Sequence, residues 1–185
     1  GSASLTGATV DNVGTLTVTN AATVSGGTLT NETGAHLTAG SASLTGATVN
    51  NSGAATVTGS ASLSGGTFTN VTAASTLEVG SAALSSSANL VNNGTVTVDH
   101  DASLQSGSHL TNNATGAVTV VGNATADAST IDNHHTLTVD GTATLSNGTH
   151  LTSDGTVHVV GAATVQSSSQ VVNSGTLTLD AAASL

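Results

Sequence analysis

The chain has 185 residues, of which 22 are glycine and one is aromatic (Phe68), with no cysteine or proline. Lysine and arginine are absent, and the ten acidic residues give a net charge of −10. Nucleic-acid binding depends on Lys and Arg contacts with phosphate, and anionic lipids repel an acidic surface, so nucleic acid and direct membrane insertion are excluded as roles of this segment. Without cysteine, disulfide bonds cannot stabilise the fold either.

A repeat of about 20 residues runs from the first residue to the last and indicates a stack of similar turns. We divide the chain into about nine turns of about 19 to 22 residues and the start of a tenth. Residues 1–10 recur unchanged at residues 40–49, which indicates growth by duplication. We therefore treat residues 1–185 as a single β-solenoid repeat array and expect it to be a fragment of a longer chain, with any export signal outside it.

Each turn begins with a short expected strand in which apolar and small polar residues alternate, as in Ala3-Ser4-Leu5. This alternation is typical of a strand with one buried face. Aligning the turns predicts two inward columns. The small column is Ala3, Ala22, Ala42, Ala61, Ala82, Ala102, Ala124, Ala143, Ala163 and Ala183. The larger column is Leu5, Val24, Leu44, Leu63, Leu84, Leu104, Ala126, Leu145, Val165 and Leu185.

The second expected strand of each turn supplies a third apolar column and, two residues later, an asparagine. The apolar column is Val10, Leu29, Val49, Phe68, Leu90, Leu110, Ile131, Leu151 and Val171. The polar positions are Asn12, Asn31, Asn51, Asn70, Asn92, Asn112, Asn133, Ser153 and Asn173. Inward asparagines stacked at a bend can bond to the backbone and to the amides of neighbouring turns, so we expect a structural asparagine ladder.

After the ladder position the chain bends into a third strand, such as Leu16-Thr17-Val18. Glycines follow two residues after the ladder in five turns, and we expect them to supply a positive φ: Gly14, Gly53, Gly94, Gly155 and Gly175. The bend is longer at residues 31–37, 70–77 and 112–118, so these segments should bulge outward on one edge. A last corner near Thr19 should separate the third strand from the next turn.

Together these elements predict an all-β fold, a parallel β-helix (β-solenoid) with three short strands per turn. Parallel crossovers are almost always right-handed, so we expect a right-handed coil. With about 4.8 Å between turns, nine turns should form a rod of roughly 43 Å.

The order of asparagine, glycine and alternating strand, as in residues 12–18 and 92–98, resembles the haemagglutinin-type repeats of bacterial secreted adhesins. The repeats are also similar to those of autotransporter passenger domains. The resemblance covers the whole chain through low-complexity motifs. It implies a right-handed parallel β-helix that a Gram-negative bacterium exports and displays as a filamentous stalk. The complete absence of Lys and Arg departs from the usual composition of those families.

Histidine and aspartate are the side chains that could carry metal or catalytic chemistry. His109 and His150 should face outward two turns apart, roughly 9.6 Å, which is too far for one metal ion. His134 and His135 are adjacent and should point apart, and the remaining histidines are scattered on outer positions: His36, His100 and His158.

Three corner aspartates, Asp99, Asp101 and Asp140, are calcium candidates, and an acidic solvated edge is the alternative. The acidic residues are spread along the length with no basic partner. We therefore expect no enzyme activity, no catalytic residue and no cofactor.

The third strand offers a different surface, because two threonines should face outward in several turns. These outward threonine rows are Thr15, Thr17, Thr95, Thr97, Thr136, Thr138, Thr176 and Thr178. Such a grid is the surface of ice-binding β-solenoids, although threonine is also favoured on exposed strands. The rows are interrupted at His36, Ala54, Glu78, Ala117 and His158.

The sequence favours a non-catalytic structural segment of a bacterial cell-surface or extracellular fibre or adhesin, acting as a stalk or filament. The alternatives are an ice-binding β-solenoid and a weak glycan-binding module that uses the Thr and Asn faces. We expect an extracellular or cell-surface location. The expected partners are further copies of the chain, other surface polymers and glycans.

Overall fold

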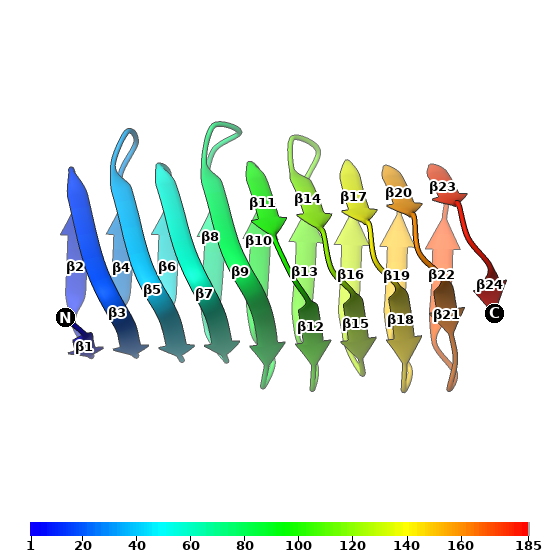
Figure 1. Cartoon of the computed structure of the whole chain (residues 1–185), viewed down its shortest axis with the longest axis horizontal. Helices are drawn as coiled ribbons and strands as arrows, with labels where there is room; N and C mark the ends of the chain where they lie inside the picture. Colours follow the sequence, from blue (N-terminus) through cyan, green and yellow to red (C-terminus); the bar gives the residue numbers. More distant parts are fainter. Residues whose placement is uncertain (185) are drawn as a thin grey trace.

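The computed structural model describes residues 1–184, and all regular structure in that range is β-strand. The strands stack side by side along one axis and pair in parallel (Figure 1). The nearer strands run downward and the farther strands run upward as the chain advances from left to right, so the coil is right-handed. The predicted parallel β-solenoid of about nine turns is therefore confirmed. No helix in the described range is long and apolar enough to cross a membrane.

The second strands of the nine turns form one sheet, which lies at the back in Figure 1. Each has four residues and ends on the ladder position. In order along the axis they are β2 (Thr9–Asn12), β4 (Thr28–Asn31), β6 (Thr48–Asn51), β8 (Thr67–Asn70), β10 (Asn89–Asn92), β13 (His109–Asn112), β16 (Thr130–Asn133), β19 (His150–Ser153) and β22 (Gln170–Asn173).

The third and first strands form a second sheet of 15 strands. Its N-terminal part consists of β1 (Ala3–Thr6), β3 (Thr15–Ser25), β5 (His36–Thr45), β7 (Ala54–Ser64) and β9 (Thr76–Ser85). It then divides. One branch continues through third strands, namely β11 (Thr95–Val98), β14 (Ala117–Val120), β17 (Thr136–Val139), β20 (Thr156–Val159) and β23 (Thr176–Leu179). The other continues through first strands, namely β12 (Ala102–Gln105), β15 (Ala124–Asp127), β18 (Ala143–Ser146), β21 (Ala163–Val165) and β24 (Ala183–Ser184).

The expected break near Thr19 is wrong for the first four turns, because Thr19 lies inside β3. In β3, β5, β7 and β9 the third strand of one turn runs directly into the first strand of the next. Between the last inward residue of the third strand and the alanine of the first strand, β5 and β9 have two residues, Gly40-Ser41 and Gly80-Ser81. β3 and β7 have three residues there, and the register shifts at this point. From Asp99-His100-Asp101 onward the three-residue links lie outside the strands, so each turn has three separate strands.

The strand registers place each of the three apolar columns in line. Val10 pairs with Leu29, Leu29 with Val49, and the series continues to Val171. The alanine column and the larger column beside it align in the same way up to Ala183 and Val165. Leu185, which was expected to end the larger column, lies outside the described residues. A shift of the strand pairing by one residue would have moved these side chains to the outer face of the sheet, so the repeat fixes the register.

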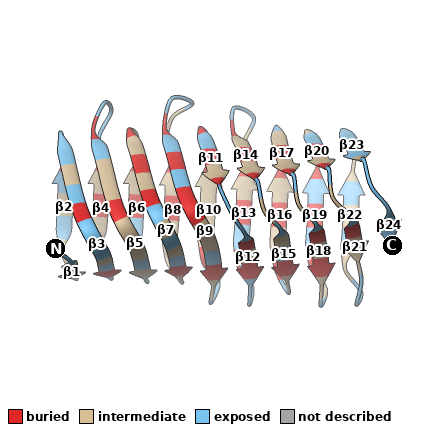
Figure 2. Ribbon diagram, viewed as in Figure 1, coloured by how far each residue is buried: buried red, intermediate tan, exposed pale blue. Residues whose placement is uncertain are grey.

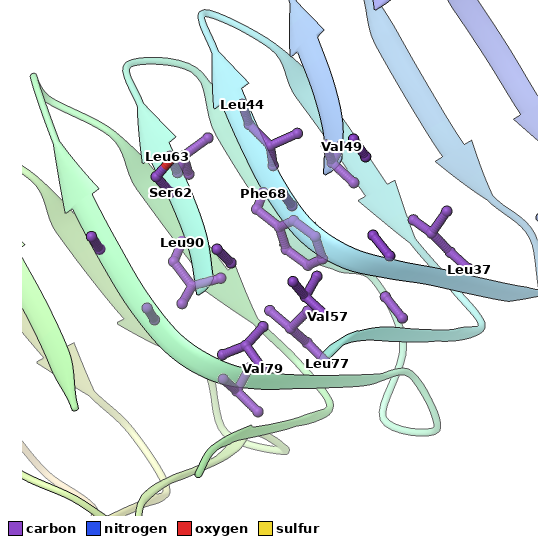
Figure 3. Close-up of a pocket in the computed structure, with 18 of the residues that line it drawn as sticks. Leu37, Leu44, Val49, Val57, Ser62, Leu63, Phe68, Leu77, Val79 and Leu90 are labelled. Carbon is purple, nitrogen blue, oxygen red and sulfur yellow. The ribbon is translucent and has the colours of Figure 1, made fainter. Parts of the chain in front are cut away.

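The core is a narrow apolar column between the two sheets. Its residues are most deeply buried in the middle turns, where Val49 and Val96 are each 1% exposed, and exposure rises toward both ends (Figure 2). Phe68 is the largest core side chain, and its ring lies among leucines and valines of neighbouring turns (Figure 3). No turn can bury its own inner face alone, so stability accumulates with stacking.

The glycines after the ladder do not have the positive φ that we expected. They are required for a different reason: a Cβ on Gly53, Gly94, Gly155 or Gly175 would lie less than 3.0 Å from a backbone oxygen of the preceding turn. Gly14, in the first turn, has no such neighbour.

Positive φ values instead mark the corner between the first and second strands. Glycine occupies them in the early turns, and serine, alanine or asparagine takes over in many later ones: Gly7, Gly26, Gly27, Gly46, Gly65, Gly66, Ser86, Ser87, Ser106, Gly107, Ala128, Asn147, Gly148, Ser167 and Ser168.

The three longer bends form loops on one edge of the rod, visible at the top of Figure 1. They follow β4, β8 and β13, which belong to alternate turns. The expected outward bulges at residues 31–37, 70–77 and 112–118 are therefore present. Because the extra residues leave the strands, the stacking of the core continues beneath them without interruption.

Candidate functional site

A line of asparagine side chains runs through the interior beside the apolar core. Each ends a strand of the nine-stranded sheet, so the parallel registers place the next one directly above it. The ladder residues that are fully buried, with 0% exposure, are Asn31, Asn51, Asn70, Asn92, Asn112 and Asn133. A buried amide needs partners for two N–H donors and one carbonyl oxygen.

The amides bond to one another in a single direction along the axis. Each Nδ2 donates to the Oδ1 of the asparagine in the next turn, from Asn12 to Asn133, over distances of 2.7 to 3.0 Å. The same Nδ2 also donates to the backbone oxygen of the first residue of the next third strand, as from Asn51 to Thr76 at 2.8 Å. The ladder thus ties the second strand of one turn to the third strand of the next.

Serine interrupts the ladder in the eighth turn. Ser153 is 2% exposed, and its Oγ accepts a hydrogen bond from Asn133 Nδ2 at 3.1 Å. Its side chain has no amide to donate onward. As a result, Asn173 Oδ1 is buried without a hydrogen-bond partner among the described residues. An unpaired buried acceptor is costly, so this is the weak point of the ladder.

Restoring the ladder at this point should stabilise the protein. We expect Ser153→Asn to raise the free energy of unfolding by about 1 to 2 kcal/mol, because the new amide would donate to Asn173 Oδ1. Urea unfolding followed by far-ultraviolet circular dichroism measures this. The matched control is Ser103→Asn, which adds the same atoms on the outer face of β12. An equal gain from both variants would contradict the role assigned to Asn173.

The outward threonines of the third strands lie in two parallel columns on the 15-stranded sheet. One column is Thr15, His36, Ala54, Thr76, Thr95, Ala117, Thr136, Thr156 and Thr176. The other is Thr17, Thr38, Thr56, Glu78, Thr97, Thr119, Thr138, His158 and Thr178. We call these two columns together the threonine surface. Its neighbouring turns are about 4.8 Å apart, as in any parallel sheet.

Sequence reasoning missed several members of this surface. Thr38, Thr56, Thr76, Thr119 and Thr156 complete the columns, and each could have been found from its fixed position beside the inward residues of the third strand. A further run of four threonines was missed on the nine-stranded sheet. It consists of Thr9, Thr28, Thr48 and Thr67, each directly before a residue of the Val10 column.

The histidines do not form a common site. His109 and His150 occupy the same outer column two turns apart, with Thr130 between them. His134 lies 2.9 Å from Asp154, and His158 lies 2.8 Å from Asp180, so each pairs with an aspartate of a following turn. These pairs are solvent-exposed and contribute little to stability.

The calcium candidates also lie in separate places. Asp101 Oδ1 accepts hydrogen bonds from the backbone and side-chain nitrogens of Asn123, at 2.8 and 3.1 Å. Asp99 and Asp140 begin corners two turns apart, with Val121 at the corner between them. Within residues 1–184, no three His, Asp or Glu side chains come together as a group that could hold a metal ion.

Comparisons with protein-family models, curated proteins and solved structures find no match to this chain.

Proposed function

We propose that this chain is a non-catalytic structural segment of a bacterial cell-surface or extracellular fibre, acting as a stalk or filament. The observation that carries the proposal is the continuity of the stack. Every turn from β1 to β24 pairs in parallel with its neighbours, and the asparagine ladder adds a hydrogen-bonded line of side chains along the same axis.

Such a stack resists extension, because separating two turns breaks several strand hydrogen bonds together and, in the first eight turns, a ladder bond as well. Pairing is uniform along the axis, so length can be added without changing the cross-section. A rod with these properties suits reach and mechanical resistance. The resemblance of the repeats to secreted adhesins supports the same role.

The composition supports a location outside the cell. A chain without Lys or Arg offers trypsin-like proteases no cleavage site, and its net charge of −10 keeps rods apart and soluble. The acidic side chains are spread along the rod, and the proposal gives them no catalytic role.

Immunogold electron microscopy of the source cells tests this proposal. Antibody raised against the purified rod should label uniform filaments that project from the cell surface, at sites along their length. Label confined to the cytoplasm, or found only on isolated short particles, would contradict it. Antibody absorbed with purified rod serves as the control for specificity.

A second candidate function, ice binding, is favoured by the register of the threonine surface. The structure aligns Thr97, Thr119 and Thr138 in three consecutive turns, and aligns Thr136, Thr156 and Thr176 in the neighbouring column. The regular spacing of hydroxyl and methyl groups on a sheet suits the surface of an ordered solid. Glu78 and His158 interrupt the surface, which divides it into shorter patches.

If this second candidate is correct, the purified rod should show thermal hysteresis. Thr138→Leu should remove most of it, because this residue lies at the end of one aligned run and adjoins another. Thr152→Leu, on the outer face of the nine-stranded sheet, is the matched control and should retain it. Nanolitre osmometry provides the measurement, and an absence of hysteresis in the unaltered rod eliminates the candidate.

A further inference from the structure

A groove of about 530 Å³ crosses the outer surface of the 15-stranded sheet. It follows the first-strand parts of β7, β9, β12 and β15 and ends at the link before β18. These elements lie side by side on the near face of the rod in Figure 1. From Ser60 at one end to Thr142 at the other, the groove crosses four steps between turns, or roughly 19 Å at the spacing of a parallel sheet.

The groove exists because the outward side chains of the first strands are small. The strand registers arrange them in two rows along the axis. One row stands directly before the alanine column and consists of Ser60, Ser81, Asp101, Asn123 and Thr142. The other follows the alanines and consists of Ser62, Ala83, Ser103 and Thr125. Each turn therefore presents a hydroxyl, carboxylate or amide group to the groove about every 4.8 Å.

Hydrogen bonds between turns hold the polar groups of the first row in place. Asp101 Oδ1 accepts the two bonds from Asn123 described above. Asn123 Oδ1 in turn accepts bonds from the backbone nitrogen and Oγ1 of Thr142, at 3.0 and 2.8 Å. Asp101 is exposed, and these bonds do not use its second carboxylate oxygen. A ligand would meet a line of polar groups that is already ordered, so little side-chain entropy is lost on binding.

The charge around the groove favours a cationic ligand. Among the described residues, Asp101 is the one charged residue in the wall of the groove. Asp99 and Asp140 lie two residues before Asp101 and Thr142, and both are exposed. The chain has no Lys or Arg, and its net charge is −10. The field of the rod therefore repels an anionic polymer and attracts a cationic one.

The repeat of the groove favours a polymer with one polar unit per turn. The sugar rings of an extended polysaccharide follow one another at nearly the spacing of the turns, and their hydroxyls both donate to and accept from serine and threonine. In an extended peptide, side chains on one face repeat every two residues, about 6.7 Å, which does not match the turns. An aliphatic polyamine is cationic but has no hydroxyl groups for the two rows.

From these observations we propose that the groove binds a linear polysaccharide of amino sugars with free amines, with one ring per turn. An ammonium group pairs with Asp101, and ring hydroxyls bond to the serine and threonine side chains of the two rows. The proposal places glycan binding on the first strands, away from the threonine surface. It does not depend on the proposed role as a surface fibre.

Titration of the purified, ¹⁵N-labelled chain with a β-1,4-linked glucosamine pentamer tests the proposal by nuclear magnetic resonance. At about pH 6.5 the aspartates are ionised, and the pentamer carries protonated amines. Binding should be saturable and should shift the backbone amides of Ser81, Ala83 and Ser103. The N-acetylated pentamer lacks the charge and spermine lacks the hydroxyls, so each should bind at least about fivefold more weakly. Equal binding by either comparison compound would overturn the proposal.

A matched pair of charge variants separates the groove from general attraction to an acidic rod. Asp101→Asn keeps an oxygen acceptor for Asn123 and should weaken binding of the glucosamine pentamer about fivefold. Asp132→Asn removes the same charge from the outer face of the nine-stranded sheet. It should change binding by less than about twofold at physiological ionic strength, because salt screens a distant charge. Equal effects of the two variants would contradict the assigned contact.

A second pair of variants tests the location by filling the groove. Ala83→Leu adds three carbons in the middle of the groove and should abolish saturable binding of the glucosamine pentamer. Ala117→Leu adds the same carbons on the outer face of β14, outside the groove, and should leave binding unchanged. If the two variants bound the pentamer equally, the ligand would lie outside the groove and the proposal would be wrong.

Discussion

Replacing Asn51 with leucine should lower the free energy of unfolding by about 4 kcal/mol. Leucine has nearly the same volume but cannot form the three ladder bonds of Asn51. It would leave Asn70 Oδ1 and the Thr76 backbone oxygen without the donor they now share, and would remove the side-chain acceptor of Asn31 Nδ2. These groups are buried between turns, where water cannot replace the lost bonds. Urea unfolding followed by circular dichroism gives the free-energy difference.

The neighbouring asparagine provides a matched control. Asn50 lies next to Asn51 in β6 but faces the outside of the sheet. Asn50→Leu should change the free energy of unfolding by no more than about 0.5 kcal/mol, as is usual for surface substitutions. If the two variants lost similar stability, the effect would come from leucine in this strand and the ladder would have no special role.

Replacing Gly66 with alanine should lower the free energy of unfolding by about 4 kcal/mol, the same loss as expected for Asn51→Leu. Two effects combine at this corner. The φ of Gly66 is +76°, which an L side chain rarely adopts, and a Cβ would collide with the backbone of Ala47 in the preceding turn. Ala47 cannot move away easily, because its backbone oxygen accepts the hydrogen bond of Thr67 N at 2.9 Å.

Gly65 separates these two effects. Its φ is +63°, but the nearest atom to an added Cβ is Ser86 O at 3.6 Å, which is an ordinary contact. Gly65→Ala should therefore cost only about 1 kcal/mol, the part that comes from the backbone conformation. Thermal unfolding of both variants at matched concentration measures the difference. Equal losses would show that the turns are not packed as closely as described.

The repeat made the registers of the fold predictable from sequence. An apolar residue recurs at one position of every turn, as at Val10, Leu29 and Val49, and only stacking of whole turns buries such residues together. The asparagine positions followed from the same alignment. The loops were predictable because the strands on both sides keep their register, so the extra residues between Asn31 and Leu37 had to lie outside the paired strands.

Other features depend on contacts between turns that a single repeat does not reveal. Gly53 looked like a residue chosen for its backbone freedom, yet the backbone oxygens of Ala35 and Glu32 in the turn below explain it. The joining of strands across the Thr19 corner was not predictable from one repeat either, because three-residue links lie inside β3 and β7 but separate the strands from Asp99-His100-Asp101 onward. The consequence of Ser153 was also hidden, because the atom left without a partner belongs to Asn173 in the next turn.

Spacing along the outer column of the nine-stranded sheet tests the central claim most directly. The chain has no cysteine, so spin labels can be attached to introduced cysteines without removing native ones. We would pair Thr9→Cys with His109→Cys, His150→Cys or Gln170→Cys, which lie five, seven and eight turns away in one register. Pulsed electron paramagnetic resonance should give distances that increase by about 4.8 Å per turn. Distances that do not increase with the number of turns would contradict the stacked solenoid.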